Sequence, residues 1–269
     1  MAHPLDGCRA KLNRAAETIQ SLGAEIEVFL SSGASEIAIT RQHQPDGLEY
    51  AFIARGNPEV PLRFAVLAGE IVHHMRSSLD HVVHALIVRN GQTPTRTSQF
   101  PICVSAKAFK DARSRGQIRG LRSSAARLVE AVQPFTSQTP DDTVLSVVNQ
   151  MDILDKHKLL VVVTAAVALG DSITIGADEE VAGTQARQGM SPNIVGFGDP
   201  TPRKLSPDGV QVFGIRLADP APEFEANATF IPQIAFEKCG RVRLAPVIQS
   251  LSGMLAGTRH TVESFMYEF

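Results

Sequence analysis

The sequence predicts an α+β protein: a bundle-like helical core with an N-terminal β-hairpin, and a C-terminal antiparallel β region closed by a long helix. Apolar residues recur at helical spacing through most of the first 170 residues. Glycine, proline and short alternating runs dominate 171–241, and helical spacing returns after 243. We expect one domain over 1–269, with the helical core mainly in 1–170, the β-rich part in 171–241 and the helix 243–267 packing back on the core.

The N-terminal segment predicts a helix over 4–31. Apolar residues repeat every seven positions from Leu5, and a second series repeats from Cys8. This two-seam heptad suits either an ordinary bundle helix or a helix that pairs across a dimer axis. Two alternating runs then flank Pro45-Asp46-Gly47, a turn signal, and predict a β-hairpin over residues 37–54.

The remaining elements follow from periodicity and from proline and glycine positions. Residues 158–169 are apolar on every side, so periodicity does not separate helix from buried strand; their alanines favour helix. The segment 183–207 is long enough to be a mobile loop or a functional lid. We expect helices at 63–89, 106–112, 122–132, 142–168 and 243–267, and strands near 173–175, 210–217 and 224–236.

Composition limits the partners and the compartment. A formal net charge of −2 gives no overall attraction to nucleic acid or to anionic membrane. Three widely separated cysteines favour free thiols in a reducing compartment. No signal peptide is recognisable, and the apolar run 159–169 is too short to span a bilayer, so we expect a cytoplasmic protein without membrane contact.

One segment departs from the overall charge. Residues 107–127 carry seven basic side chains against the single acid Asp111. Such a patch is either a local contact for nucleic acid or a solvated helix-and-loop face. The basic residues are Lys107, Lys110, Arg113, Arg115, Arg119, Arg122 and Arg127.

The central helix carries an unusual set of polar residues opposite its apolar face. Lys, Glu, Gln and Arg would be ordinary on a solvent-facing strip, whereas His, Ser and Asp are poorer helix formers with useful chemistry. We therefore expect a functional site on this helix. His73, Ser77, Asp80 and His84 form the strip, His74 and His81 flank it, and Arg76 lies at its edge.

Arg76 to His81 spells Arg-Ser-Ser-Leu-Asp-His, an Arg-x4-His spacing that resembles the active-site motif of HEPN domains. Many proteins of that family are metal-free ribonucleases whose motif lies on one helix of a bundle, and two protomers usually pair around it. The resemblance implies that His81 transfers a proton and that Arg76 stabilises the phosphorane charge. Ser77 stands where those nucleases commonly have Asn, Asp or His, and the β-rich second half departs from a plain HEPN bundle.

A wider pattern resembles an uncharacterised bacterial family. Its helix Gly-(Asp/Glu)-x-x-His-x-x-Arg-Ser-x-Leu-Asp-His is followed by Phe-Pro-Ile, Gln-Pro-(Phe/Tyr) and Asp-Lys-His-(Arg/Lys). All occur here in order, and the resemblance covers residues 65 to 160. It implies that Asp155, Lys156 and His157 meet the central helix. Because both polar clusters interrupt apolar stripes, we expect them to meet in a polar pocket or cleft. His74 stands where that family usually has Asn.

Two other interpretations of the same residues remain open. Imidazoles and carboxylates on neighbouring helices are ligands for zinc, iron or manganese. However, His73 and His84 are ~16 Å apart along a helix and cannot share one ion. Alternatively, Arg76 and Asp80, an i, i+4 pair, could join Asp155, Lys156 and His157 in an ion network that holds the helices in register.

The favoured function is that of a HEPN-like, metal-independent ribonuclease or phosphodiester-processing enzyme. Its expected catalytic residues are Arg76, His81, Asp80 and His157, without a metal or another cofactor. RNA is the expected partner, with a homodimer formed through the N-terminal heptad helix or the central helix. The alternatives are a non-enzymatic helical interaction or structural protein with a buried Arg-Asp-His network, and a metal-dependent His/Asp enzyme. Exposure of Arg76 and His81 favours the enzyme; burial and mutual pairing favour the interaction protein.

Overall fold

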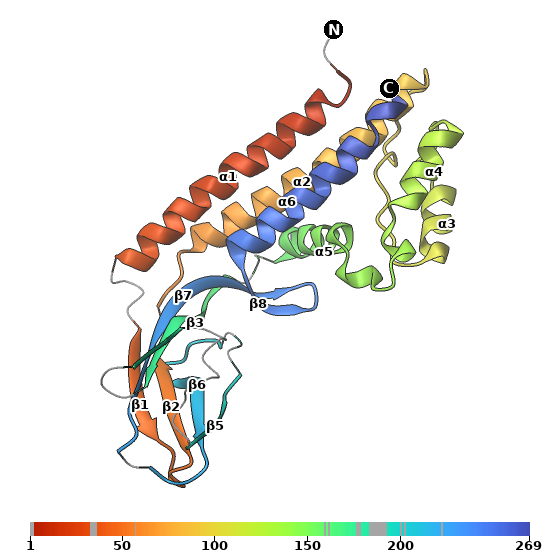
Figure 1. The fold of residues 1–269 in the computed structure, drawn as a ribbon. Helices are drawn as coiled ribbons and strands as arrows, with labels where there is room; N and C mark the ends of the chain where they lie inside the picture. The colour runs from red at the N-terminus through yellow and green to blue at the C-terminus, as the bar shows by residue number, and fades with distance from the viewer. Residues whose placement is uncertain are drawn as a thin grey trace. The chain divides into compact units, whose positions relative to one another are not determined.

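The computed structural model describes residues 3–32, 37–56, 58–158, 160, 162–175, 179–182, 193–199, 201, 203–221 and 223–269. It confirms an α+β fold, drawn in Figure 1. The chain divides into two compact units, 1–25 with 61–161 and 238–269, and 26–60 with 162–237. The expected hairpin thus belongs with the later strands, because they share one sheet.

The helical elements are α1 (Asp6–Ser31), α2 (Leu62–Arg89), α3 (Ala106–Ser114), α4 (Ser123–Ala131), α5 (Val144–His157) and α6 (Val247–Ser264), with short 3-10 turns at Pro134–Thr136, Pro140–Asp142 and Met266–Glu268. The strands are β1 (Ala38–His43), β2 (Glu49–Arg55), β3 (Val162–Ile175), β4 (Glu179–Ala182), β5 (Ile194–Phe197), β6 (Val210–Leu217), β7 (Ala226–Cys239) and β8 (Val242–Pro246).

Three long helices form the centre of the first unit, with α1 antiparallel to α2 and α6 (Figure 1). Ion pairs fix this direction: Arg9 near the start of α1 binds Glu263 near the end of α6 at 2.6 Å, and Glu25 binds Arg63 at the start of α2. The heptad residues of α1 from Leu5 to Ile26 are buried within the same chain. The heptad seam therefore serves as a helix contact within the chain.

The central helix α2 buries an apolar stripe along its full length. Its last turn ends at Asn90, and Gly91 follows with φ of 71°, a conformation that glycine adopts at little cost. α6 packs back on α2 and α5, as the sequence predicts. Among the described residues, no helix is both long and apolar enough to cross a membrane.

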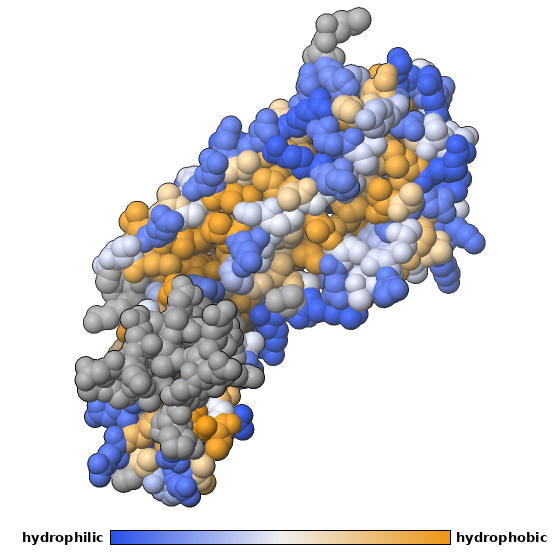
Figure 2. Space-filling view, in the orientation of Figure 1, coloured by the Kyte–Doolittle hydropathy of each residue, from blue (hydrophilic) through white to orange (hydrophobic). Residues whose placement is uncertain are grey.

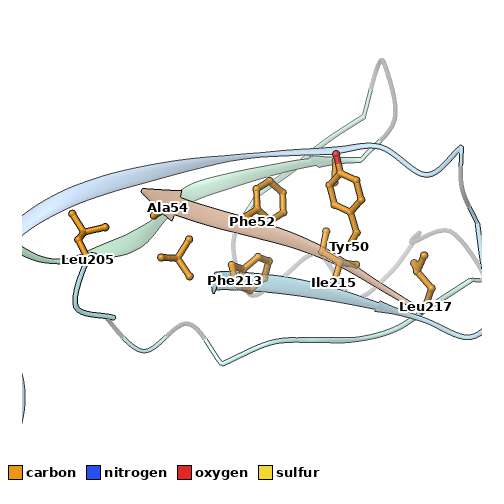
Figure 3. Packing of buried hydrophobic residues seen from close by; sticks show 9 residues of the cluster. Tyr50, Phe52, Ala54, Leu205, Phe213, Ile215 and Leu217 are labelled. Atoms are coloured by element: carbon orange, nitrogen blue, oxygen red, sulfur yellow. The ribbon is translucent and has the colours of Figure 1, made fainter. Parts of the chain in front are cut away.

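The second unit holds the hairpin and most of the later strands. β1, β2, β6 and β5 form one antiparallel sheet, and β4, β3, β7 and β8 follow one another in a second. Asp46 accepts the backbone N–H of Leu48 in the predicted hairpin turn, and Gly47 has φ of 71°. Figure 3 shows the aromatic core of this unit, in which the ring centroids of Tyr50 and Phe52 are 5.6 Å apart in an edge-to-face arrangement.

Two expected helix boundaries are wrong. α5 ends at His157, and residues 162–169 begin the 14-residue strand β3, which pairs with β7. Likewise, residues 242–246 form β8, so α6 starts only at Val247. In both places backbone pairing with β-structure outweighs the helix propensity of the side chains. Of the segment 183–207, which the sequence suggests is a loop or lid, residues 194–197 instead form β5, paired with β6, and residues 183–192, 200 and 202 lie outside the described residues.

Candidate functional site

Arg76 and Asp80 form a clamp on the backbone of Phe100. The Arg76 guanidinium donates to Asp80 Oδ1 at 2.7 Å and to the Phe100 carbonyl at 2.9 Å. Asp80 Oδ1 also accepts the Phe100 N–H at 2.8 Å. Only 10% of the Arg76 side chain is exposed. The i, i+4 spacing predicts this pair, but the carbonyl that completes it comes from a distant loop.

The same hydrogen-bond network extends to the Gln-Pro-Phe motif. Gln133 is buried, donates to the Pro101 carbonyl at 2.9 Å and accepts the Cys103 N–H at 3.0 Å. The Phe135 N–H donates to the Cys103 carbonyl. Three motifs that are distant in the sequence therefore form one scaffold, with every polar group of Gln133 satisfied.

His84 lies one turn beyond Asp80 on the same side of α2. One of its ring nitrogens, Nε2, is 3.0 Å from the Ser98 carbonyl. Because a carbonyl only accepts, Nε2 must carry the proton that it donates to Ser98. The ring itself is exposed. His84 is thus oriented by the protein and open to solvent.

The α5 side of α2 carries a separate polar cluster. Asp152 is buried to 3% exposure and binds the Lys156 ammonium at 2.6 Å and His73 Nδ1 at 3.3 Å. Asp155 lies against Gly69, where a Cβ would approach its carboxylate to 2.3 Å. Burial, and then the charge of Asp152, raises the pKa of Asp155.

The predicted meeting of the Asp-Lys-His motif with α2 is confirmed in part. Asp155 touches Gly69, and Lys156 is joined to His73 through Asp152, in the first half of α2. His157 is exposed and forms no hydrogen bond or ion pair with any described residue. His157 does not join Arg76, Asp80 and His81. The α5 residues that contact α2, Asp152 and Asp155, lie on the other side of α5 from His157.

His74 and His81 are two turns apart and face α1. Gly7 lies beside the His81 ring, since a Cβ on Gly7 would be 3.6 Å from His81 Nδ1. Partial burial, followed by the positive charge of Lys11, lowers the pKa of both histidines. His81 is nonetheless exposed, whereas His74 is half-buried and its Nδ1 has no hydrogen-bond partner among the described residues.

Lys11 completes a histidine–lysine cluster, defined here as Lys11, His81 and His84. The charges of Lys11 and His84 both act on His81. Lys11 is half-buried, and no hydrogen bond or ion pair joins its ammonium to a described residue. The group is therefore available to an anion. Lys11 was missed in the sequence because its relation to α2 depends on the packing of α1.

Asp152 was also missed. Its position four residues before Lys156 was a usable signal for an ion pair. Ser77, a predicted site-lining residue, is half-buried and forms no hydrogen bond with a described residue, whereas its neighbour Ser78 is buried and donates to the Met75 carbonyl. Within the described residues, no three His, Cys, Asp or Glu side chains are placed to hold a metal ion.

The contacts separate the predicted site residues into three groups on different sides of α2. Arg76 and Asp80 bind the loop at Phe100, His73 binds α5, and His74 and His81 face α1. Comparison of the chain with family models, with curated proteins and with solved structures finds no match.

Proposed function

We propose that the protein is a HEPN-like, metal-independent ribonuclease of the cytoplasm in which His81 transfers the proton. The observation that carries the proposal is the histidine–lysine cluster: the exposed imidazole of His81 faces α1 at Gly7, and Lys11 follows Gly7 one turn later on that helix, its ammonium without a described partner. A histidine that is neutral near physiological pH can accept a proton, and a free cation can hold a phosphate oxygen.

The proposed reaction is internal transesterification of RNA. His81 takes the proton of a 2′-hydroxyl, and the resulting oxygen attacks the adjacent phosphorus. The bond from phosphorus to the 5′-oxygen breaks, and protonated His84 supplies a proton to that leaving oxygen. Lys11 stabilises the negative charge of the pentacoordinate phosphorane. The products are a 2′,3′-cyclic phosphate and a 5′-hydroxyl.

Arg76 has a positioning role in this proposal. Its guanidinium is occupied by Asp80 and by the Phe100 carbonyl, so it is not offered to phosphate. The clamp instead holds the loop that includes Ser98, the residue whose carbonyl orients His84. The cation that the family resemblance implies at Arg76 is supplied here by Lys11.

Incubation with mixed RNA in excess EDTA tests the proposal. We expect cleavage that leaves 2′,3′-cyclic phosphate ends and that is absent with all-deoxy substrate. His81→Ala should lower the rate by ~100-fold or more, as expected for loss of a general base. His260→Ala is the matched control, since His260 is also exposed but lies on α6. No cleavage by the wild type, or equal loss in both variants, contradicts the proposal.

A second candidate is a non-enzymatic interaction module, which the Arg76–Asp80 clamp favours because both charged groups are satisfied within the chain. Apolar side chains gather over the long helices of the first unit in Figure 2, and Leu62, Val66 and Val88 are exposed on α2. Such side chains suit a partner helix or a second copy of the chain.

RNA cleavage separates the two candidates, because a HEPN-like nuclease is itself expected to pair; sedimentation equilibrium tests the association surface of the second candidate. An interaction module should self-associate or bind a partner without cleaving RNA, and Val66→Lys should weaken that association because it places a charge in an apolar contact. Val195→Lys, at an exposed strand position of the second unit, is the control. A monomer that cleaves RNA excludes the second candidate.

A further inference from the structure

We infer that a cavity between α3 and α4 binds one nucleotide of an RNA strand, through its phosphate, and so forms a substrate subsite remote from the histidine–lysine cluster. The cavity has a volume of about 380 Å³. Arg113, Arg119 and Arg127 line it against one carboxylate, Glu130. The inference rests on the proposed function for the identity of the strand, but the cavity itself is an independent observation.

The arginines of the cavity are free to bind an anion. No ion pair or side-chain hydrogen bond joins Arg113, Arg119 or Arg127 to a described residue, and all three are exposed. Three cations beside one acid leave a local excess of positive charge in a chain whose formal net charge is −2. Guanidinium groups suit phosphate because their N–H groups can bind two of its oxygens at once.

Local structure explains why the cations converge. Gly116 has φ of 84° and ends α3, and the guanidinium of Arg119 lies over it, with Cζ 3.7 Å from where a Cβ would stand. Ser123 is the first residue of α4, and Arg127 lies one turn further along the helix. Because no side chain caps this end of α4, its dipole adds to the attraction for an anion.

The walls of the cavity are partly apolar. Ile118, Leu121 and Ala126 line it together with the arginines. A flat heterocycle can rest on such a surface while its phosphate meets the guanidinium groups, and a volume of this size is typical of small-molecule sites. A nucleotide therefore satisfies the lining better than an inorganic anion, which would leave the apolar part uncovered.

Contacts join the cavity to the end of α2, the helix that carries His81 and His84. The Asn90 side chain donates to the Gly120 carbonyl at 2.9 Å and accepts from Arg122 at 3.0 Å, which fixes the turn before α4 to the end of α2. His84 and Asn90 are six residues apart, or about 9 Å along the helix axis. In addition, the Gln99 N–H binds the Gln117 carbonyl, next to Ile118 of the cavity.

Binding of a non-cleavable, fully 2′-O-methylated RNA, followed by fluorescence anisotropy, tests the inference without requiring catalysis. The double variant Arg119→Gln/Arg127→Gln should weaken binding by at least about tenfold and reduce the slope of log K against log salt by about 1 to 2. Arg243→Gln is the control for loss of one exposed arginine outside the cavity. The Lys11→Gln variant distinguishes binding at the cluster from binding at the cavity.

The outcomes separate the inference from the proposed function. RNA binding that is lost in the arginine variant supports the inference, even if the wild type proves unable to cleave. Binding equal in wild type and arginine variant overturns it, whatever the cleavage result. If the protein binds AMP but does not bind the RNA, the cavity is a site for free nucleotides, and the RNA assignment is overturned. No binding of either ligand also overturns the inference.

Discussion

Arg76 and Asp80 are joined by a 2.7 Å ion pair within one turn of α2, and both bind the backbone of Phe100. The pair thus links the central helix to a loop 20 residues further along the chain. Its arginine is nearly buried, whereas about a third of the Asp80 side chain is exposed. The energetic consequence is asymmetric, because removing the acid leaves a buried cation behind.

Asp80→Ala should destabilise the protein by about 3 to 5 kcal/mol, measured by urea unfolding, because Arg76 loses its counter-ion and the Phe100 N–H loses its acceptor. Asp80→Asn should cost less, since its amide oxygen can still accept. Glu17→Gln breaks the exposed Arg14–Glu17 pair and should cost less than about 1 kcal/mol. A clamp without a stabilising role would make the Asp80 and Glu17 variants indistinguishable.

His74 should make the fold sensitive to acid. Burial, followed by the charges of Lys11 and His73, lowers its pKa in the folded protein below the ordinary value. The unfolded chain therefore binds the proton more tightly than the folded protein does. As the pH falls below about 6.5, protonation of His74 favours the unfolded chain, and the free energy of unfolding decreases.

The measurement is the difference in thermal midpoint between pH 7.5 and pH 5.5. His74→Asn should reduce that difference, with the remainder due partly to His81, whose pKa is lowered in the same direction. His260→Asn removes an exposed imidazole and should leave the difference as in the wild type. An unchanged difference in His74→Asn would show that this ring contributes nothing to acid sensitivity.

Two aspartates one turn apart on α5 should respond oppositely to neutralisation. Asp152→Asn should destabilise by about 1 to 3 kcal/mol at pH 7, because Lys156 and His73 lose a charged partner. Asp155→Asn should instead stabilise, since burial and the charge of Asp152 raise the pKa of Asp155 and disfavour its ionised form. The gain should shrink as the pH falls through that pKa, because the wild type then becomes protonated too. Destabilisation by Asp155→Asn at pH 7 would refute this account.

Gly69 should depend on Asp155. A Cβ at Gly69 would lie 2.3 Å from an Asp155 oxygen, so Gly69→Ala should cost about 1 to 3 kcal/mol through displacement of that carboxylate. In an Asp155→Ala background, the same change should become neutral or favourable by up to about 1 kcal/mol, because alanine is the better helix former. Urea unfolding of the four proteins gives the coupling energy directly. Additive effects would mean that the two residues do not interfere.

Local patterns in the sequence determined the elements whose residues carry their own signals. Apolar periodicity located α2 to within one residue, and the alternation over 210–217 located β6. The Pro45-Asp46-Gly47 turn predicted the hairpin because glycine tolerates the positive φ that the turn requires. The Arg76–Asp80 pair followed from their spacing on one helix.

Only the tertiary structure decided the features that depend on a distant partner. Residues 162–169 are a strand because β7 supplies hydrogen-bond partners for their backbone, which outweighs the helix propensity of their alanines. Arg76 is withdrawn from solvent because the Phe100 loop folds over it, and the charge of Lys11 acts on His81 because α1 packs on α2. Each of these features depends on which distant surfaces of the chain pack together, and the local periodicity of the sequence does not contain that information.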